Sequence, residues 1–285
     1  MVGTEINKRR KAHGAGRKAK TIKENQSSPC ALSLTPCATM LQIGDFSLRT
    51  AWINSQGELM HTFVLFDIDG TLVSLDGAGS RSLNRAMEEL LQVTDGFRNI
   101  DFAGKTDLQI IREALGALGL ADRDDLMHSL LDRYLVHLRD EVSKGRGHVK
   151  NGVRELLAAL HDLGIYLGLL TGNAEVGARL KLEPFGLNRY FPVGAFGSDS
   201  EDRNLLLPIA VQRLQEFESI SVSHDRCVVI GDTPKDVECA HVHGASAIAV
   251  ATGPYPLKEL EKTKAELVTA DLSNTANIVD WIKKK

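Results

Sequence analysis

Short apolar runs alternate with longer segments of helical period throughout the chain after residue 60. The runs are TFVLFD, YLGLLT, PVGAF, CVVIG and SAIAVA. Each run is apolar at odd and even positions alike, as expected for strands of a parallel sheet covered on both faces. The stretches between them, RELLAALHDLG, EVGARLKLEPFG, NLLLPIAVQRLQEF and KDVECAHVHG, have the pattern of amphipathic helices. This alternation predicts an α/β fold with a doubly wound, Rossmann-like parallel sheet.

One interval, from about Gly79 to Gly147, carries helical patterns only. It contains SRSLNRAMEELLQV, DLQIIREALGALG and DDLMHSLLDRYLVHLRDEV. A crossover between parallel strands needs a single helix, so several in succession predict an inserted helical cap. We assign residues 78–147 to this cap and residues 60–77 and 148–285 to the core domain. The alternative is a few extra helices packed on the sheet.

The first 59 residues differ from the rest. They begin with a segment dense in Lys and Arg (NKRRKAHGAGRKAK), continue with many Ser, Pro and Thr residues, and show no apolar periodicity. This composition predicts a disordered basic extension. A targeting peptide or a nucleic-acid-binding arm is less favoured, because Glu5 and Glu24 interrupt the basic segment and no apolar segment follows it. Met60 precedes the first strand, so the natural protein could also begin there.

Composition narrows the range of partners. The chain has 285 residues, is 43% hydrophobic and carries a formal net charge of −3, which gives no overall attraction to nucleic acid or to anionic membranes. The longest apolar runs have strand length, so we expect no membrane span. Four cysteines (Cys30, Cys37, Cys227 and Cys239) form no CxxC pair, which favours a reducing cytoplasm. A small molecule is the expected partner, and the oligomeric state stays open.

Polar residues follow three of the predicted strands. The segments are Asp67-Ile68-Asp69-Gly70-Thr71, Thr171-Gly172-Asn173 and Gly231-Asp232-Thr233-Pro234-Lys235-Asp236. The carboxyl ends of parallel strands meet at one edge of a sheet, where helix N-termini also point their N–H groups at anions. We therefore expect these segments to face a single crevice.

Four carboxylates would meet in this crevice, those of Asp67, Asp69, Asp232 and Asp236. Like charges this close need a compensating cation. Mg²⁺ prefers oxygen ligands and typically shares its coordination sphere between one or two carboxylates and a substrate phosphate. Zinc is not expected, because the HxH pair of His241 and His243 lies in a predicted helix away from the strand ends.

The spacing of the first two aspartates suits phosphoryl transfer. With Mg²⁺ and a phosphate bound, one carboxylate can attack phosphorus while a second protonates the leaving oxygen and later activates water. Residues two apart in a strand point to the same side, so Asp67 and Asp69 can both reach the crevice. Gly70 permits a sharp turn and the hydroxyl of Thr71 can tie the loop. Thr171 offers a hydroxyl to a phosphoryl oxygen.

The ordered set DIDGT, LLTGN and GDTPKD resembles the motifs of the haloacid dehalogenase superfamily, and the helical insert resembles its C1-type cap. The resemblance covers nearly the whole chain from residue 60. It implies that Asp67 is the nucleophile and a Mg²⁺ ligand, and that Asp69 is the acid/base with its backbone carbonyl on the metal. It also implies that Thr171 binds phosphate, that Asp232 is a metal ligand and that Asp236 supports the ligands from behind. We expect Thr71, Gly172 and Asn173 to bind the substrate.

The sequence departs from the superfamily pattern in one respect. A lysine usually lies between the second and third motifs and neutralises the nucleophile and the phosphate, but the matching region GSDSEDRNLLLPIAVQRL has none. Arg203 is the best substitute, because its guanidinium can bridge a carboxylate and a phosphate. Lys235 is a weaker candidate.

Asp69 also helps to choose among functions. True dehalogenases of the superfamily lack an aspartate two residues after the nucleophile, so Asp69 favours a phosphatase or a phosphomutase. The runs DGTLVS and FAGKTD look most like phosphoglycolate phosphatase-type hydrolases. Lys105, Thr106 and Asp107 could reach a substrate from the cap or could simply begin a helix. A phospho-acceptor signalling domain is the alternative from another class, although it needs neither the second aspartate nor a cap.

Overall fold

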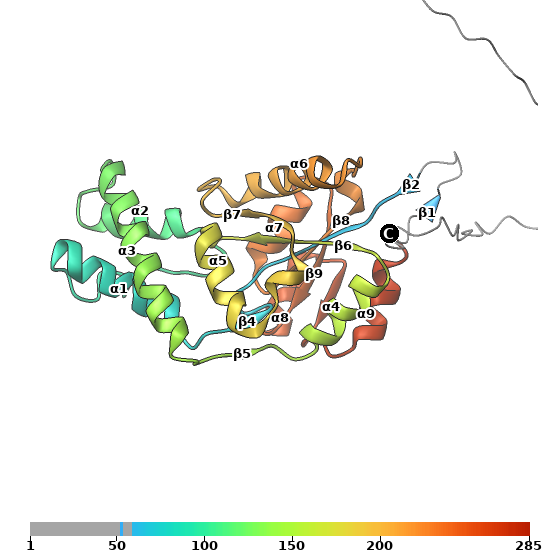
Figure 1. Cartoon of the computed structure of the whole chain (residues 1–285), viewed down its shortest axis with the longest axis horizontal. Coiled ribbons are helices and arrows are strands. Elements are labelled where there is room, and N and C mark those ends of the chain that lie inside the picture. The colour runs from blue at the N-terminus through green and yellow to red at the C-terminus, as the bar shows by residue number, and fades with distance from the viewer. Residues whose placement is uncertain (1–51, 54–58) are drawn as a thin grey trace, which may run out of the picture. The chain divides into compact units, whose positions relative to one another are not determined.

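A six-stranded parallel sheet forms the centre of the fold in the computed structural model, which describes residues 52–53 and 59–285 (Figure 1). The strand order is β10-β9-β8-β3-β6-β7, and every neighbouring pair is parallel. The strands are β3 (Phe63–Phe66), β6 (Tyr166–Thr171), β7 (Val193–Phe196), β8 (Cys227–Gly231), β9 (Ser246–Val250) and β10 (Leu267–Thr269). The five apolar runs of the sequence thus all form strands of one sheet.

Alternate residues of each strand enter two separate apolar cores. In β3, Val64 and Phe66 pack in one core, whereas Phe63 and Leu65 pack in the other. The first core is covered by α4 (Val153–Asp162), α5 (Glu175–Leu182) and α9 (Thr275–Ile282), and the second by α6 (Leu206–Glu218), α7 (Pro234–His241) and α8 (Leu257–Leu260). Helices on both faces explain why the strands are apolar at both parities. The predicted doubly wound α/β fold is confirmed.

The sixth strand was not predicted. β10 is only three residues long, lies at the edge of the sheet, and its side chains are half-buried. Its segment AELVTA is too short and too mixed in polarity to stand out from a loop.

The interval between β4 (Val73–Ser74) and β5 (His148–Val149) is helical, as expected. It holds α1 (Ala78–Leu91), α2 (Asp107–Ala117) and α3 (Asp124–Ser143), and β4 and β5 pair antiparallel at its base. Helix α3 packs against α1, α2 and also α5. The buried apolar side chains of the inserted helices belong to the same apolar core as α4 and α9. The boundaries of the cap at residues 78 and 147 stay a prediction.

Part of the predicted disordered extension has regular structure. Strand β1 (Trp52–Ile53) pairs antiparallel with β2 (Leu59–Met60) at the end of this segment. The disordered extension stays a prediction. The rest of the predicted extension lies outside the described residues.

Two further expectations concern the surroundings of the protein. No helix within the described residues combines the length and the apolar character needed to cross a membrane. Cys227 and Cys239 are buried free thiols, and burial raises the pKa of each to about 12. Cys30 and Cys37 lie outside the described residues. The predicted cytoplasmic location is consistent with these thiols and stays a prediction.

Candidate functional site

The central strand of the sheet ends at the first aspartate of the predicted site. β3 lies between β6 and β8, and the chain order reverses at this point, which is where α/β sheets open a crevice for ligands. The backbone N–H of Asp67 still donates to the carbonyl of Ile230 in β8, at 3.0 Å, so the carboxylate is held at the end of the ladder. A cavity of about 450 Å³ opens here between the strand-end loops and the inserted helices.

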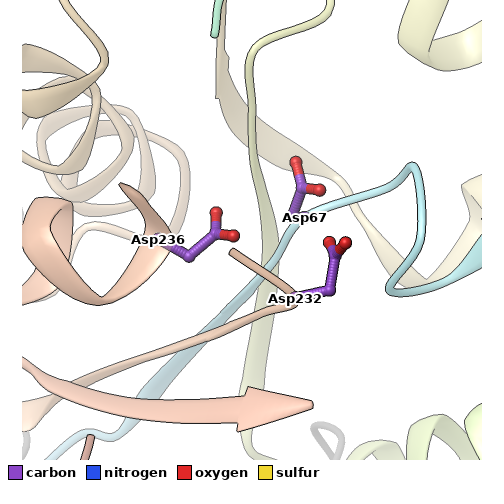
Figure 2. Close-up of side chains that lie close together, drawn as sticks. All are labelled: Asp67, Asp232 and Asp236. Atoms are coloured by element: carbon purple, nitrogen blue, oxygen red, sulfur yellow. The ribbon is translucent and has the colours of Figure 1, made fainter. Parts of the chain in front are cut away.

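Three carboxylates converge at this strand end. Single oxygen atoms of Asp67, Asp232 and Asp236 all lie within 4.8 Å of one another, and the three side chains point toward one another from β3, the end of β8 and the start of α7 (Figure 2). Burial, opposed by Arg203, raises the pKa of Asp67 to about 6. Burial, followed by the charges of Asp67 and Asp236, raises the pKa of Asp232 well above its ordinary value. Such a cluster favours a bound cation.

Two glycines make room for the carboxylate of Asp232. A Cβ atom at Gly253 would lie 1.6 Å from its Oδ2, and one at Gly70 would lie 2.4 Å from the same atom. Gly70 also has a φ of +85°, which disfavours other residues. The backbone is therefore shaped around this carboxylate.

Thr71 supports the same carboxylate and does not reach the cavity. Its hydroxyl is fully buried and donates to Oδ1 of Asp232, at 2.9 Å. This bond is consistent with the expected role of Thr71 in tying the loop, and its expected contact with the substrate stays a prediction. The turn at Gly70 directs the hydroxyl toward β8.

Asp236 is engaged by protein groups on both oxygens. Its Oδ2 accepts from the backbone N–H and the hydroxyl of Thr233, at 2.9 and 2.8 Å, which completes a capping box at the start of α7. Its Oδ1 accepts from the guanidinium of Arg203. These contacts fit a supporting position behind the ligands.

Arg203 lies beside the expected nucleophile. It begins a short 3-10 helix (Arg203–Leu205), its side chain is buried, and its Nη2 donates to Oδ1 of Asp67 at 3.1 Å as well as to Asp236. The structure thus brings the predicted substitute cation to the first aspartate. Lys235 pairs instead with Glu238 of its own helix and is half-exposed.

A second cation in the cavity was not foreseen. Lys181 in α5 is buried, and its Nζ lies 2.6 Å from Oδ2 of Asp69 and 2.5 Å from Oδ1 of Asn173. The amide of Asn173 donates to Oδ2 of Asp69 at 2.8 Å and to the hydroxyl of Thr171 at 2.9 Å. Lys181 also lies between the second and third motifs, but it comes before the segment GSDSEDRNLLLPIAVQRL, where the superfamily lysine was expected. The available signal was a lysine seven residues after Ala174 and four after Gly177, on the apolar face of α5.

The inserted helices meet the loop after β6 directly. The backbone N–H of Asp107 donates to the carbonyl of Gly172 at 2.7 Å, and its carboxylate accepts from the N–H of Ala174 at 2.8 Å. A Cβ atom at Gly172 would lie 2.0 Å from the carbonyl oxygen of Lys105, so this approach requires glycine. Burial raises the pKa of Asp107 to about 6.

The three cap residues considered as substrate contacts have different positions. Thr106 is the N-cap of α2, is fully buried, and donates to the backbone carbonyl of Glu201. Asp107 docks on the loop after β6. Lys105 and Asp107 line the cavity, and the ammonium group of Lys105 pairs with Glu113 at 2.6 Å.

His241 and His243 belong to no group of three or more ligating side chains within residues 52–53 and 59–285. His241 lies near Glu266, at 3.3 Å, and His243 contacts the carbonyl of Asn204, at 2.5 Å. The group of Asp67, Asp232 and Asp236 is the metal-compatible cluster found within the part of the chain that the structure describes.

The residues at the carboxylate cluster fit Mg²⁺. All candidate donors are carboxylate oxygens, which Mg²⁺ prefers, and they lie within 4.8 Å of one another. Asp67 and Asp232 have oxygens available to an ion, whereas both oxygens of Asp236 already accept from Thr233 and Arg203.

Comparison with known proteins agrees with this geometry. The sequence profile described as haloacid dehalogenase-like hydrolase matches residues 64–250. Phosphoglycolate phosphatase of Rhodospirillum rubrum is 30% identical over 225 residues, which cover 77% of this chain and 90% of the relative. Tyrosine-protein kinase PtkA of Mycobacterium tuberculosis is 28% identical and covers 72% of this chain and 67% of its own length.

Solved structures share the fold at lower identity. The crystal structure of beta-phosphoglucomutase from Clostridium difficile covers 79% of this chain and 98% of its own, with a TM-score of 0.60 and 16% identity. The family profile runs from β3 to β9 and includes the inserted helices and all three motif segments. The chain therefore belongs to the haloacid dehalogenase-like hydrolases.

Proposed function

We propose that this hydrolase cleaves phosphate monoesters of small metabolites, phosphoglycolate-like compounds or sugar phosphates, in a Mg²⁺-dependent reaction through an aspartyl phosphate. The observation that carries this proposal is the pair of Asp67 and Asp69 lining one cavity beside Asp232. A cavity of about 450 Å³ suits a small ligand. The relative named phosphoglycolate phosphatase supports phosphate ester chemistry.

The first step transfers the phosphoryl group to the protein. A carboxylate oxygen of Asp67 attacks phosphorus and the bond from phosphorus to the ester oxygen breaks. Asp69, as the carboxylic acid, gives its proton to that oxygen, so the product leaves as an alcohol. Asp69 is then a carboxylate and Asp67 carries the phosphoryl group.

The second step restores the protein. Water attacks phosphorus and passes a proton to the carboxylate of Asp69 while the bond between phosphorus and Asp67 breaks. Inorganic phosphate leaves, and both aspartates return to their starting states. The sum is one water and one ester converted to one alcohol and one phosphate.

Other residues of the chain hold these groups in place. Asp67, Asp232 and the backbone carbonyl of Asp69 would hold Mg²⁺, which supplies positive charge to the phosphoryl oxygens when bound. Arg203 orients Asp67 through its contact at 3.1 Å. Thr171 and the backbone of Gly172 border the place where the phosphate would lie, and both line the cavity.

A phosphate-release assay on the full chain tests the proposal. Wild-type protein should release phosphate from p-nitrophenyl phosphate and from one or more members of a panel of phosphorylated metabolites when Mg²⁺ is present. Removal of Mg²⁺ by a chelator should abolish release, and added Mg²⁺ should restore it. Asp67→Asn should reduce turnover on the order of 10⁴-fold or more, because an amide is a poor nucleophile.

Asp125→Asn is the matched control. Asp125 is an exposed carboxylate in α3 that pairs with Arg123 away from the cavity, so its loss should leave turnover unchanged. Near-normal turnover of Asp67→Asn would contradict the nucleophilic role. Interconversion of phosphosugars without phosphate release would identify a mutase. A stable phosphoprotein with no turnover in the wild type would favour the signalling alternative.

A further inference from the structure

Lys181 is buried although it carries a charged end. The residue is 4% exposed and comes from α5, where its neighbours on the same face are small or apolar. Placing an ammonium group away from water is costly unless it is paired and hydrogen-bonded. The cost of removing the ammonium group of Lys181 from water must therefore be offset by specific hydrogen-bonding partners.

The partners of Lys181 form a closed network around one oxygen atom. Lys181 Nζ and Asn173 Nδ2 both donate to Oδ2 of Asp69, at 2.6 and 2.8 Å, and Lys181 also donates to Oδ1 of Asn173 at 2.5 Å. Both hydrogen bonds go to Oδ2, and within the described residues Oδ1 of Asp69 accepts no hydrogen bond from a side chain. The carboxylate is thus held by one oxygen and left open at the other.

Stability alone does not account for this arrangement. The side chain of Asp69 is 48% exposed, and ion pairs with a partner this exposed contribute little to folding free energy. Helix α5 is nevertheless fixed around the lysine, because Asp107 binds the N–H of Ala174 and α3 packs on α5. The helix is held so that the ammonium group meets Asp69 at the cavity.

We infer that Lys181 is a positioning residue for proton transfer: with Asn173 it fixes Oδ2 of Asp69 so that Oδ1 exchanges the proton with the ester oxygen and the water. This inference rests on the proposed function. It separates the two cations of the cavity, since Arg203 orients Asp67 and Lys181 orients Asp69. Loss of Lys181 should therefore impair proton transfer more than phosphoryl attack.

The leaving group provides a direct measure. A p-nitrophenolate ion leaves without much help from an acid, whereas an alkoxide needs the proton. We expect Lys181→Met to slow turnover of an alkyl phosphate such as glycerol phosphate by about 10²-fold, the size of effect caused by small misplacement of a catalytic group. Turnover of p-nitrophenyl phosphate should fall less, and the phosphorylated protein should accumulate in acid-quenched samples, because water activation also needs Asp69.

Two variants and one control complete the experiment. Lys181→Arg keeps donors to both partners and should recover part of the alkyl phosphate activity, and Lys181→Gln serves if Lys181→Met does not fold. Arg179→Met removes a cation from the same helix, where it contacts Glu175 and the carbonyl of Phe191, and should leave the ratio of the two activities unchanged.

The outcomes separate this inference from the function on which it rests. An equal fall for both substrates without accumulation of phosphorylated protein, or no fall, overturns the positioning role while the wild type still hydrolyses phosphate esters. Absence of turnover in the wild type with either substrate contradicts the proposed function itself.

Discussion

The two cations of the cavity are held in different surroundings. Arg203 contacts Asp67 and Asp236, and all three side chains are buried. Lys181 is equally buried, but its carboxylate partner Asp69 is half exposed. In the first cluster each charge depends on the others, because water does not reach them. In the second, one carboxylate oxygen stays open. The two cations therefore differ in how far water can replace them: the partners of Arg203 are buried, whereas the partner of Lys181 is open to water.

The largest expected difference between the two clusters is in the free energy of unfolding lost when each cation is removed. Arg203→Met leaves two buried carboxylates without their cation, and we expect a loss of about 3–5 kcal/mol in the free energy of unfolding. Lys181→Met should cost on the order of 1 kcal/mol or less, because water can solvate Asp69. Urea unfolding of both variants, followed by circular dichroism, measures the difference.

Arg203→Lys is the control for this pair. It keeps the charge but loses the forked geometry of the guanidinium group. Its free energy of unfolding should therefore lie between that of the wild type and that of Arg203→Met. Similar losses for Arg203→Met and Lys181→Met would show that the exposure of the partner does not decide the cost.

The strand ends of this site were readable in the sequence. The run FVLF buries β3 on both faces, and the turn at Gly70 that follows requires glycine, so Asp67 and Asp69 had to lie at the edge of the sheet. The parallel, two-sided sheet also followed from the apolar pattern of the strands, whereas their order in the sheet did not. These features depend on local pattern and on general rules of parallel sheets.

The contacts between helices were not readable in the same way. Lys181 reaches Asp69 across 112 residues of sequence, and its place depends on how α5 packs against α3 and Asp107. The hydrogen bond from Thr71 to Asp232 is a second example, because these two residues lie 161 positions apart in the sequence. The periodicity of a short segment does not specify contacts between residues so far apart in sequence. Tertiary packing determines them.

The titration of Asp107 sharpens the comparison on the Lys181 side. Burial raises its pKa from 3.8 to about 6, with Lys181 acting in the opposite direction. The folded protein thus binds this proton more tightly than the unfolded chain, and stability falls as pH rises from about 4 to 6. Asp107→Asn removes this pH-dependent contribution. The free energy of unfolding of the variant should therefore rise relative to that of the wild type between about pH 4 and 6, by up to about 3 kcal/mol.

Urea unfolding of both proteins at a series of pH values measures this gain. Asp125→Asn is the control, since the hydrogen bond from Arg123 lowers the pKa of Asp125 to about 2. Asp125 therefore titrates below about pH 4. The difference in free energy of unfolding between Asp125→Asn and the wild type should stay constant between about pH 4 and 6. A constant difference for Asp107→Asn as well would show that its carboxyl is not raised by burial.

The smallest expected effect concerns an ion pair between α2 and the segment that leads to Arg203. Arg112 of α2, the helix that Asp107 begins, contacts the carboxylate of Glu201 at 2.6 Å, and Glu201 lies two residues before Arg203. Both side chains are about one third exposed, at 34% and 36%, so a double-mutant cycle of Arg112→Ala and Glu201→Gln should give a coupling of about 0.2–1 kcal/mol.

This coupling should also appear in substrate binding. Because the pair fixes the loop that carries Lys105 against the loop that carries Arg203, its loss should raise KM a few-fold and leave kcat nearly unchanged. About 1 M salt should remove the difference, since screening then acts within about 3 Å. Arg123→Ala breaks an ion pair confined to the inserted segment, with Asp125, and should not change KM. An unchanged KM in Arg112→Ala, with the coupling still present in stability, would mean that the pair ties two surfaces together without shaping the cavity between them.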